Sequence, residues 1–270
     1  MDTIHNNFYH LTWIDILISL VFVLATIMIL RYWKIGLTRT LLIGTLRTFV
    51  QLTAMGYILT WFFHQDSVWF MVGLILSMTL IASYEGYRRV REFPLKAAFP
   101  ILFASMTITL TLVLGTILKL ILKTEPWYYP YAMIPIAGMI IGNALNSATL
   151  SVNRFVSELE HREDEIEMML SLGAPVRAVV EPSFRAAVKA ALLPTINSMM
   201  MVGLVQLPGV MTGQILAGID PLVAVRYQIM IMYMWVTTAA LMDVLVLGFS
   251  YKQFFTSRGQ FRADLFRSRL

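Results

Sequence analysis

The sequence predicts an all-α protein that crosses a membrane about seven times. Of its 270 residues, 58% are hydrophobic and 14% are charged, whereas soluble domains carry about 25% charged residues. Mean hydropathy is +0.70. Apolar runs of about 20 residues, the length that spans a hydrocarbon core, recur along the chain. This composition argues against a water-soluble enzyme, and the lack of cysteine excludes disulfides and thiolate chemistry.

Seven apolar runs are predicted as membrane-spanning helices. The first contains Asp15, the second contains Arg47 and the last contains Asp243. The first run is expected to stay in the protein, because it lacks the basic flank and the small-residue cleavage site of a signal peptide. The predicted spans cover residues 11–30, 41–63, 68–83, 97–122, 131–150, 186–207 and 222–251. Residues 1–270 are therefore predicted as a single transmembrane domain.

Positive charges predict the orientation of the chain in the bilayer. Most of the 21 lysines and arginines fall in segments 31–40, 84–96 and 151–189 and in the tail after residue 251. With seven spans, all four basic segments lie on one side of the membrane. Lysine and arginine collect in cytoplasmic loops. The N-terminus is therefore expected outside and the C-terminus inside.

The longest predicted cytoplasmic segment, 151–185, contains an amphipathic pattern. Apolar residues recur at three- and four-residue spacing from Val152 to Leu170, with one gap, and acidic residues lie mostly on the other face. Gly173 predicts where this helix ends. Further helices are predicted to begin at the prolines that follow, Pro175 and Pro182.

Two interpretations of this segment stay open. It is either a solvated acidic linker between two spans or a helix that docks a cytoplasmic partner. The interval between Glu167 and Gly173 favours docking, since many permeases meet their ATPases through a short cytoplasmic helix followed by a glycine turn. The chain itself has no Gly-x-x-x-x-Gly-Lys-Ser/Thr phosphate loop. Any ATP hydrolysis is therefore expected on another polypeptide.

Small and polar residues stand out within the fifth predicted span. Gly138 and Gly142 form a GxxxG pair, a pattern that lets another backbone approach closely. Asn143 and Asn146 are three residues apart and are expected to share a helix face. Carboxamides need polar partners inside a membrane. This face is either a helix-packing surface or a wall of a permeation path.

Residues 208–221 are too rich in glycine for a simple span and too apolar for an ordinary loop. A re-entrant or broken helix near the outer mouth fits this composition, because irregular backbone at membrane depth must be buried in protein or line an aqueous cavity. An external loop is the alternative interpretation.

Charged residues within predicted spans form a third group of candidates, since such residues are costly in a bilayer. Asp15, Arg47 and Asp243 belong to it. An aspartate could pair with Arg47 in a structural role, or the group could relay protons. No metal site is assigned, because the four histidines lack ligand spacing; they are His5, His10, His64 and His161.

Three motifs in order along the chain resemble those of one permease family. They are Pro135-x-x-Gly138-Met139-x-x-Gly142-Asn143, Glu167 with Gly173-Ala174, and Leu207-Pro208-Gly209-x-Met211-Thr212-Gly213-Gln214-x-Leu216-Ala217-Gly218. Together they resemble the iron-export ABC permease family of bacteria, of FetB type, which is related to plant aluminium-sensitivity permeases. The resemblance covers nearly the whole chain.

This resemblance implies a non-enzymatic permease of the bacterial inner (plasma) membrane. It implies a cytoplasmic ABC ATPase subunit that binds the ATP, two copies of each subunit, no further cofactor and no nucleic acid. The implied cargo is a metal ion such as iron. By motif position, the ATPase-coupling residues are Glu165, Glu167, Leu172, Gly173 and Ala174. The implied transport-pathway residues are Met139, Asn143, Asn146, Met211, Gly213 and Gln214.

Two other functions remain as alternatives. The chain could be a proton-coupled secondary transporter that uses its intramembrane aspartate and arginine residues, or an ABC exporter of a small organic solute. The first alternative predicts transport without any ATPase. An intramembrane enzyme is disfavoured, because no cluster of His, Asp or Ser is found at one depth.

Overall fold

The computed structural model describes residues 12–63, 67–90 and 97–267, with side chains as far as residue 265. These residues are helical apart from turns and two isolated β-bridges, and no named strand occurs among them. The chain divides into two compact units. One comprises the chain up to Asp66 together with Leu216–Gly218, and the other comprises Ser67–Ile215 and Ile219–Leu270.

The first unit is built from α1 (Trp13–Tyr32) and α2 (Thr38–Phe62). Thr12 caps α1 in a capping box with Asp15, the third residue of the helix, whose carboxylate accepts hydrogen bonds from the Thr12 amide and hydroxyl at 2.7 and 2.8 Å. The rings of Trp13 and Phe49 meet edge to face at 6.1 Å. Taken by itself, this unit has no buried residue in either helix.

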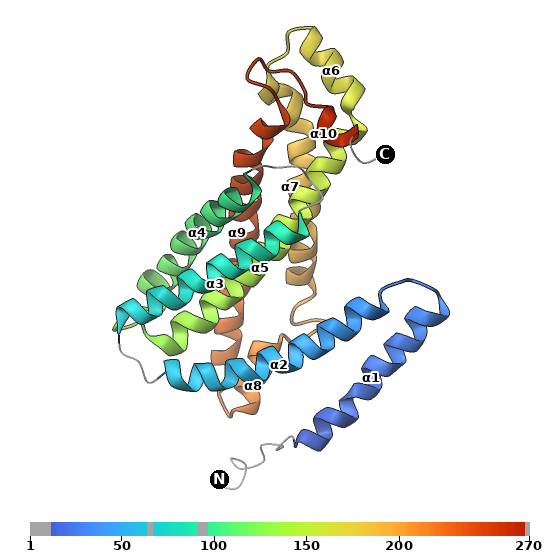
Figure 1. The fold of residues 1–270 in the computed structure, drawn as a ribbon. Coiled ribbons are helices and arrows are strands. Elements are labelled where there is room, and N and C mark those ends of the chain that lie inside the picture. The colour runs from blue at the N-terminus through green and yellow to red at the C-terminus, as the bar shows by residue number, and fades with distance from the viewer. Residues whose placement is uncertain (1–11, 64–66, 91–96, 268–270) are drawn as a thin grey trace. The chain divides into compact units, whose positions relative to one another are not determined.

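The second unit holds the remaining helices (Figure 1). They are α3 (Val68–Arg89), α4 (Ala98–Thr116) with its π-helical extension η1 (Ile117–Ile121), α5 (Pro130–His161), α6 (Glu163–Ser171), α7 (Val176–Met201), α8 (Gly209–Leu216), α9 (Pro221–Ser250), the 3-10 turn η2 (Tyr251–Phe254) and α10 (Asp264–Arg267).

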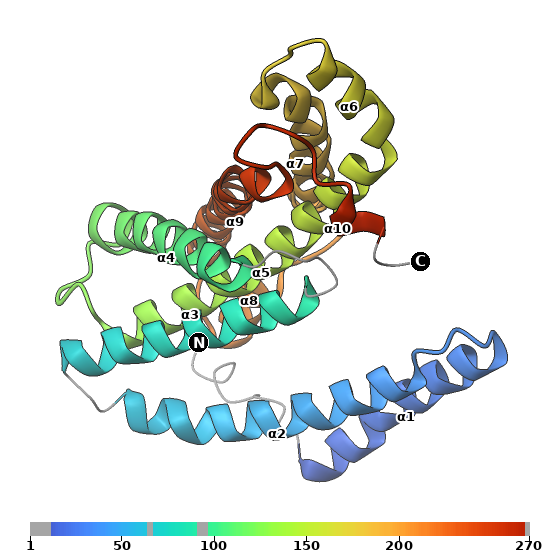
Figure 2. The ribbon, with the colours of Figure 1, turned by 45° about the horizontal axis from the view of Figure 1, so that its top comes forward.

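Helix α5 is the centre of this unit and packs against α3, α4, α7 and α9 (Figures 1 and 2). Its buried positions recur every three or four residues, which places them on one broad face. The side chains of Ile140, Phe155 and Leu159 are fully buried along this face. Helix α6 lies at the same end of the unit as α10, whereas α8 lies at the opposite end (Figure 1).

The predicted spans correspond to the seven long helices, but three of these helices differ clearly in their bounds: α3 continues past residue 83 to Arg89, α5 continues past residue 150 to His161, and α7 covers Val176–Met201 where 186–207 was predicted. Six helices among the described residues, α1 to α5 and α9, have the length and hydropathy of membrane spans. Helix α7 has 26 residues but is not one of them. Its first 14 residues carry four charges, Arg177, Glu181, Arg185 and Lys189.

The helix boundaries predicted between residues 151 and 185 need correction. Helix α5 continues from its span to His161, so the predicted amphipathic helix is divided at Arg162, where the sequence pattern has its gap. No new helix begins at Pro182, which lies inside α7. A proline removes one backbone hydrogen bond. Packing of the buried neighbours Val179, Ser183 and Ala187 supports the continuous helix.

Candidate functional site

The turn between α6 and α7 is a tight reversal that depends on one glycine. The Gly173 amide donates to the Leu170 carbonyl at 3.0 Å, and the Ala174 amide donates to the Met169 carbonyl at 3.0 Å. These two bonds form a Schellman motif. Gly173 has φ +86°, a region that side chains with a Cβ rarely adopt. The predicted end of the helix at Gly173 is therefore confirmed, and Pro175 follows as the N-cap of α7.

Helix α6 is fixed to α7 by one apolar and one polar contact region. Ile166 is fully buried. The Arg162 guanidinium donates to both carboxylate oxygens of Glu165 at 2.8 and 2.7 Å, and to the Ser183 hydroxyl on α7 at 2.8 Å. The hydrogen bonds from Arg162 hold the pKa of the Glu165 carboxyl below its ordinary value, and Glu165 raises the pKa of Arg162. Glu165 thus helps to position α6.

The opposite face of α6 is exposed and partly apolar. Leu172 is 80% exposed and Met168 is 58% exposed, and Glu167, which precedes Met168, is also exposed. Large apolar side chains that are grouped on a rigid, polar-rimmed surface are typical of contact sites. This surface of Glu167, Met168 and Leu172 is called the α6 face below.

A C-terminal hairpin lies beside the α6–α7 turn, and sequence reasoning missed it. Phe255 and Phe261 form an antiparallel bridge with ring centroids 5.6 Å apart, and the Thr256 amide donates to the Gln260 carbonyl at 2.8 Å. Both phenylalanines are buried. The aromatic residues on either side of Ser257-Arg258-Gly259 were the signal for this turn.

The hairpin and the α6–α7 turn line one groove of about 970 Å³. Glu167, Gly173 and Ala174 contribute from one side, and Arg258 and Gln260 contribute from the other. The groove therefore carries charges of both signs next to the α6 face.

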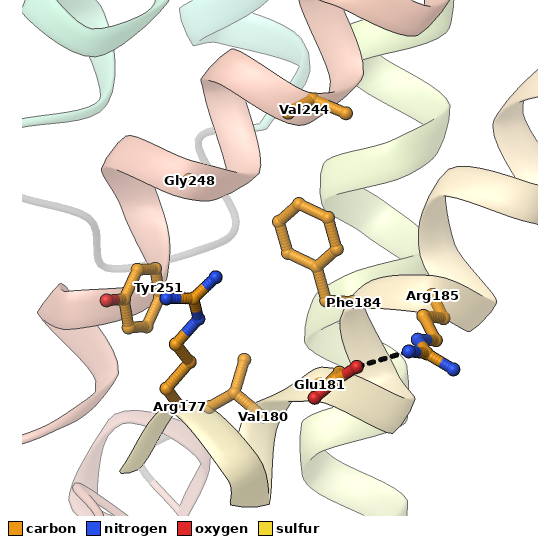
Figure 3. A pocket seen from close by; sticks show the side chains of 8 residues that line it. All are labelled: Arg177, Val180, Glu181, Phe184, Arg185, Val244, Gly248 and Tyr251. Carbon is orange, nitrogen blue, oxygen red and sulfur yellow. Dashed lines mark hydrogen bonds and ion pairs between the residues drawn. The ribbon is translucent and has the colours of Figure 1, made fainter.

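A second groove lies between α7 and α9 near the same end (Figure 3). Its volume is about 460 Å³, and Val244, Gly248 and Tyr251 form one wall. Arg177 lies beside Tyr251, whereas Arg185 forms an ion pair with Glu181 (Figure 3). Charged side chains thus flank the α6–α7 turn along the first half of α7.

The two asparagines of α5 contact different helices. The Asn143 side-chain Nδ2 donates to the Trp235 carbonyl of α9 at 2.7 Å, whereas the Asn146 side chain accepts from Arg89 of α3 at 3.3 Å. Asn143 and Asn146 therefore have different partners although they lie on neighbouring parts of one helix face, because residues three apart point about 60° away from each other on a helix. Met139 is half-buried. These contacts show helix packing and leave the pathway role as a prediction.

The GxxxG pair of α5 does not bring two backbones together within the described residues. A Cβ at Gly138 would meet only the Met78 side chain of α3, at 3.6 Å, and one at Gly142 would have no atom within 4 Å. Gly142 is exposed. This surface is therefore open for lipid, cargo or another subunit.

Residues 208–221 contain the short helix α8, and a turn at Ala217-Gly218 separates it from α9. Asp220 accepts from the Leu222 and Val223 amides at 2.9 and 3.2 Å and so begins α9. Gly213 has no neighbouring atom within 4 Å of its missing Cβ, and Met211 is half-buried. The side-chain amide oxygen of Gln214, Oε1, is buried without a hydrogen-bond partner. The depth of this segment in a bilayer stays a prediction.

The two aspartates predicted within spans have hydroxyl partners. Asp15 closes the cap of α1, as described above. Asp243 of α9 is fully buried, and its Oδ2 accepts from the Ser147 hydroxyl of α5 at 2.8 Å. His5, His10 and His64 lie outside the described residues. Within the described ranges no three His, Asp or Glu side chains are placed to hold a metal ion.

Comparison with known proteins places nearly the whole chain in one family. A model described as an uncharacterised protein family, UPF0014, matches residues 13–255. No solved structure matches the chain.

Three relatives are similar over nearly their full lengths. UPF0014 membrane protein slr1647 of Synechocystis sp. is 38% identical over 93% of this chain and 96% of its own. The probable iron export permease protein FetB of Escherichia coli is 34% identical over 94% and 96%, and the protein ALUMINUM SENSITIVE 3 of Arabidopsis thaliana is 30% identical over 93% and 90%. These matches confirm the resemblance drawn from the three motifs. The chain is a multi-pass membrane protein and belongs to the UPF0014 family.

Proposed function

We propose that this chain is the permease subunit of an ATP-driven exporter of ABC type and that its cargo is a metal ion such as iron. The observation that carries the proposal is the α6–α7 turn, a rigid reversal that presents an exposed apolar face. The name of the relative FetB, probable iron export permease protein, supports the direction and the cargo. A separate ATPase subunit supplies hydrolysis, and two copies of each subunit form the transporter.

The proposed docking surface combines the α6 face with the adjoining groove. Leu172 and Met168 enter an apolar depression of the ATPase, because they are large, exposed and held on a fixed helix. Glu167 and Arg258 select complementary charges at the rim. Gly173 and Ala174 set the angle at which α6 meets α7. In this arrangement the N-terminus of the chain lies outside and the turn lies in the cytoplasm.

The proposed pathway follows the polar residues of α5 and the α8 segment. Met139, Asn143 and Asn146 contribute from α5, and Met211, Gly213 and Gln214 contribute from α8. The buried, unpartnered oxygen of Gln214 is the group in this set best suited to bind cargo or water. Amide oxygens suit hard cations, and thioethers suit softer ones.

The first experiment measures docking after two substitutions on the α6 face, one that replaces an apolar side chain by a charged one and one that reverses a charge. Leu172→Asp and Glu167→Arg are expected to abolish copurification with the proposed ABC ATPase subunit, while membrane insertion stays normal. Glu160→Arg is the matched control, since Glu160 is an exposed acid at the end of α5, outside the docking face. Unchanged copurification of both docking variants would exclude the proposed surface.

The second experiment separates the alternative functions. The purified complex in vesicles is expected to show ATPase stimulation by a metal ion from a panel of metals and small organic solutes. Vesicles that contain the permease alone are expected to export nothing. Export by the permease alone under a proton gradient would identify a secondary transporter, and stimulation by an organic solute alone would replace the metal cargo.

A further inference from the structure

The carboxyl group of Asp243 occupies a closed polar site between α5 and α9. Asp243 is fully buried, Ser151 is fully buried and Ser147 is 6% exposed. One carboxylate oxygen accepts from Ser147 at 2.8 Å, whereas the other, Oδ1, is buried without a hydrogen-bond partner. Ser151 lies one turn further along α5 and donates to the Ala148 carbonyl at 3.1 Å. The site therefore offers two carboxyl oxygens and two hydroxyl oxygens.

The charged groups around α9 do not neutralise this carboxyl. Helix α4 carries no charged residue, and Arg154 of α5 forms an ion pair with Glu158 at 2.5 Å. The α7 charges Arg177, Glu181 and Arg185 line the separate groove beside Val244 and Gly248. The other titratable groups of α9 and its packed neighbours are Tyr131, Glu160, His161, Lys189, Arg226, Tyr227, Tyr233, Tyr251 and Lys252. Within the described part of the chain, none of these groups forms a hydrogen bond or ion pair with Asp243.

The chemistry of the site selects the cation that it can hold. A buried ionised carboxylate without a cation is strongly disfavoured, since water no longer solvates it. Calcium takes six to eight oxygen ligands and magnesium takes six, and this site supplies four. A proton needs one oxygen lone pair, which Oδ1 provides.

We propose that Asp243 is a proton-binding site and that it is a neutral carboxylic acid in the conformation described. The proton binds Oδ1, and Oδ2 remains the acceptor for the Ser147 hydroxyl. Loss of the proton leaves a full charge between α5 and α9, and that charge requires water or a cation to enter. Proton release therefore accompanies a separation of α5 from α9. The proposal does not depend on an ATPase or on the identity of the cargo.

Infrared spectroscopy of the purified full-length chain tests the protonation directly. The measurement uses a maltoside detergent, which has no ester carbonyl, at neutral pH. The wild type is expected to show the carbonyl band of a protonated carboxylic acid, and ¹³C-labelled aspartate is expected to shift it. Asp243→Asn is expected to remove the band. Asp15→Asn is the matched control and is expected to keep it, because the Asp15 carboxylate is capped by Thr12 at an exposed helix end.

A second variant keeps the test decisive if Asp243→Asn does not fold. Ser147→Ala retains the carboxyl group and removes the hydroxyl that donates to Oδ2. The band is expected to move to higher frequency in this variant, since the carbonyl loses its hydrogen bond. Absence of any aspartic acid band in the wild type, or a band that Ser147→Ala leaves in place, would overturn the proposal.

Discussion

Glu165 and Asp243 are two acidic residues of the same unit in opposite surroundings. Glu165 is exposed on α6, and two hydrogen bonds from Arg162 favour its charged form. Asp243 is fully buried in the α5–α9 interface and has a serine partner in place of a cation. The difference teaches that an acid on this chain stabilises a helix contact as a charge where water reaches it and as a neutral group where water does not.

The largest effect on the α6 attachment is expected from Ile166→Ala. Truncation of a fully buried isoleucine costs about 2–5 kcal/mol, so α6 is expected to separate from α7. Hydrogen exchange of the α6 amides measures this, and exchange should become much faster. Met168→Ala is the control on the exposed face and should leave exchange unchanged while docking weakens. Equal exchange in the two variants would show that polar contacts alone hold α6.

Gly173→Val is expected to have the next largest effect. The positive φ at this position costs a β-branched residue about 1–3 kcal/mol. The turn is expected to open and copurification with the ATPase to be lost, while the protein still inserts. Gly173→Asn is the matched control, since asparagine tolerates this backbone conformation. Full docking by the valine variant would show that the angle of the turn is unimportant.

The pH dependence of the Arg162–Glu165 contact is a smaller effect. The pKa of Glu165 is lowered in the folded protein, so the contact is complete above the ordinary glutamate range and is lost as pH falls through the lowered pKa. Hydrogen exchange of α6 should therefore speed up in acid. Glu165→Gln removes this titration, and the difference between the two pH profiles isolates it. Identical profiles would contradict the assigned role.

Arg258→Glu is expected to leave stability unchanged and to alter docking alone. Arg258 lies at the tip of the C-terminal hairpin on the groove side. Rim charges act mainly on association rates, so binding to the ATPase should slow by a few-fold and lose part of its salt dependence. The association rate is measured by binding the ATPase to this protein captured on a sensor surface. Arg262→Glu serves as a comparison, because Arg262 pairs with Asp264. A change in thermal stability would assign Arg258 to folding.

Local patterns predicted most of the helices and the end of α6. The long apolar runs corresponded to the seven long helices, and Gly173 ended α6 because few other residues accept its backbone conformation. Residues 154–170 were harder, because the apolar face of α5 passes into that of α6 with a single break at Arg162. The gap in the three- and four-residue spacing of apolar residues marks this break, although the spacing on either side predicts one helix.

Contacts between distant residues could not be predicted from the sequence. The bond from Asn143 to the Trp235 carbonyl joins residues 92 positions apart, and that from Ser147 to Asp243 joins residues 96 apart. Asp243 was recognised as an unusual charge, whereas its serine partners were hidden among ordinary helix residues. The C-terminal hairpin was missed because its two bridge residues lie outside any helical or alternating pattern.

The uninterrupted course of α5 has a mechanical consequence. Its 32 residues extend about 48 Å at 1.5 Å per residue, whereas a hydrocarbon core is about 30 Å thick. One stiff rod therefore reaches from the interior of the bilayer to the joint at Arg162. A displacement of α6 by a few ångströms would tilt the whole of α5. Because no hinge lies between Arg162 and Ser147, the tilt would also change the contact of Ser147 with α9.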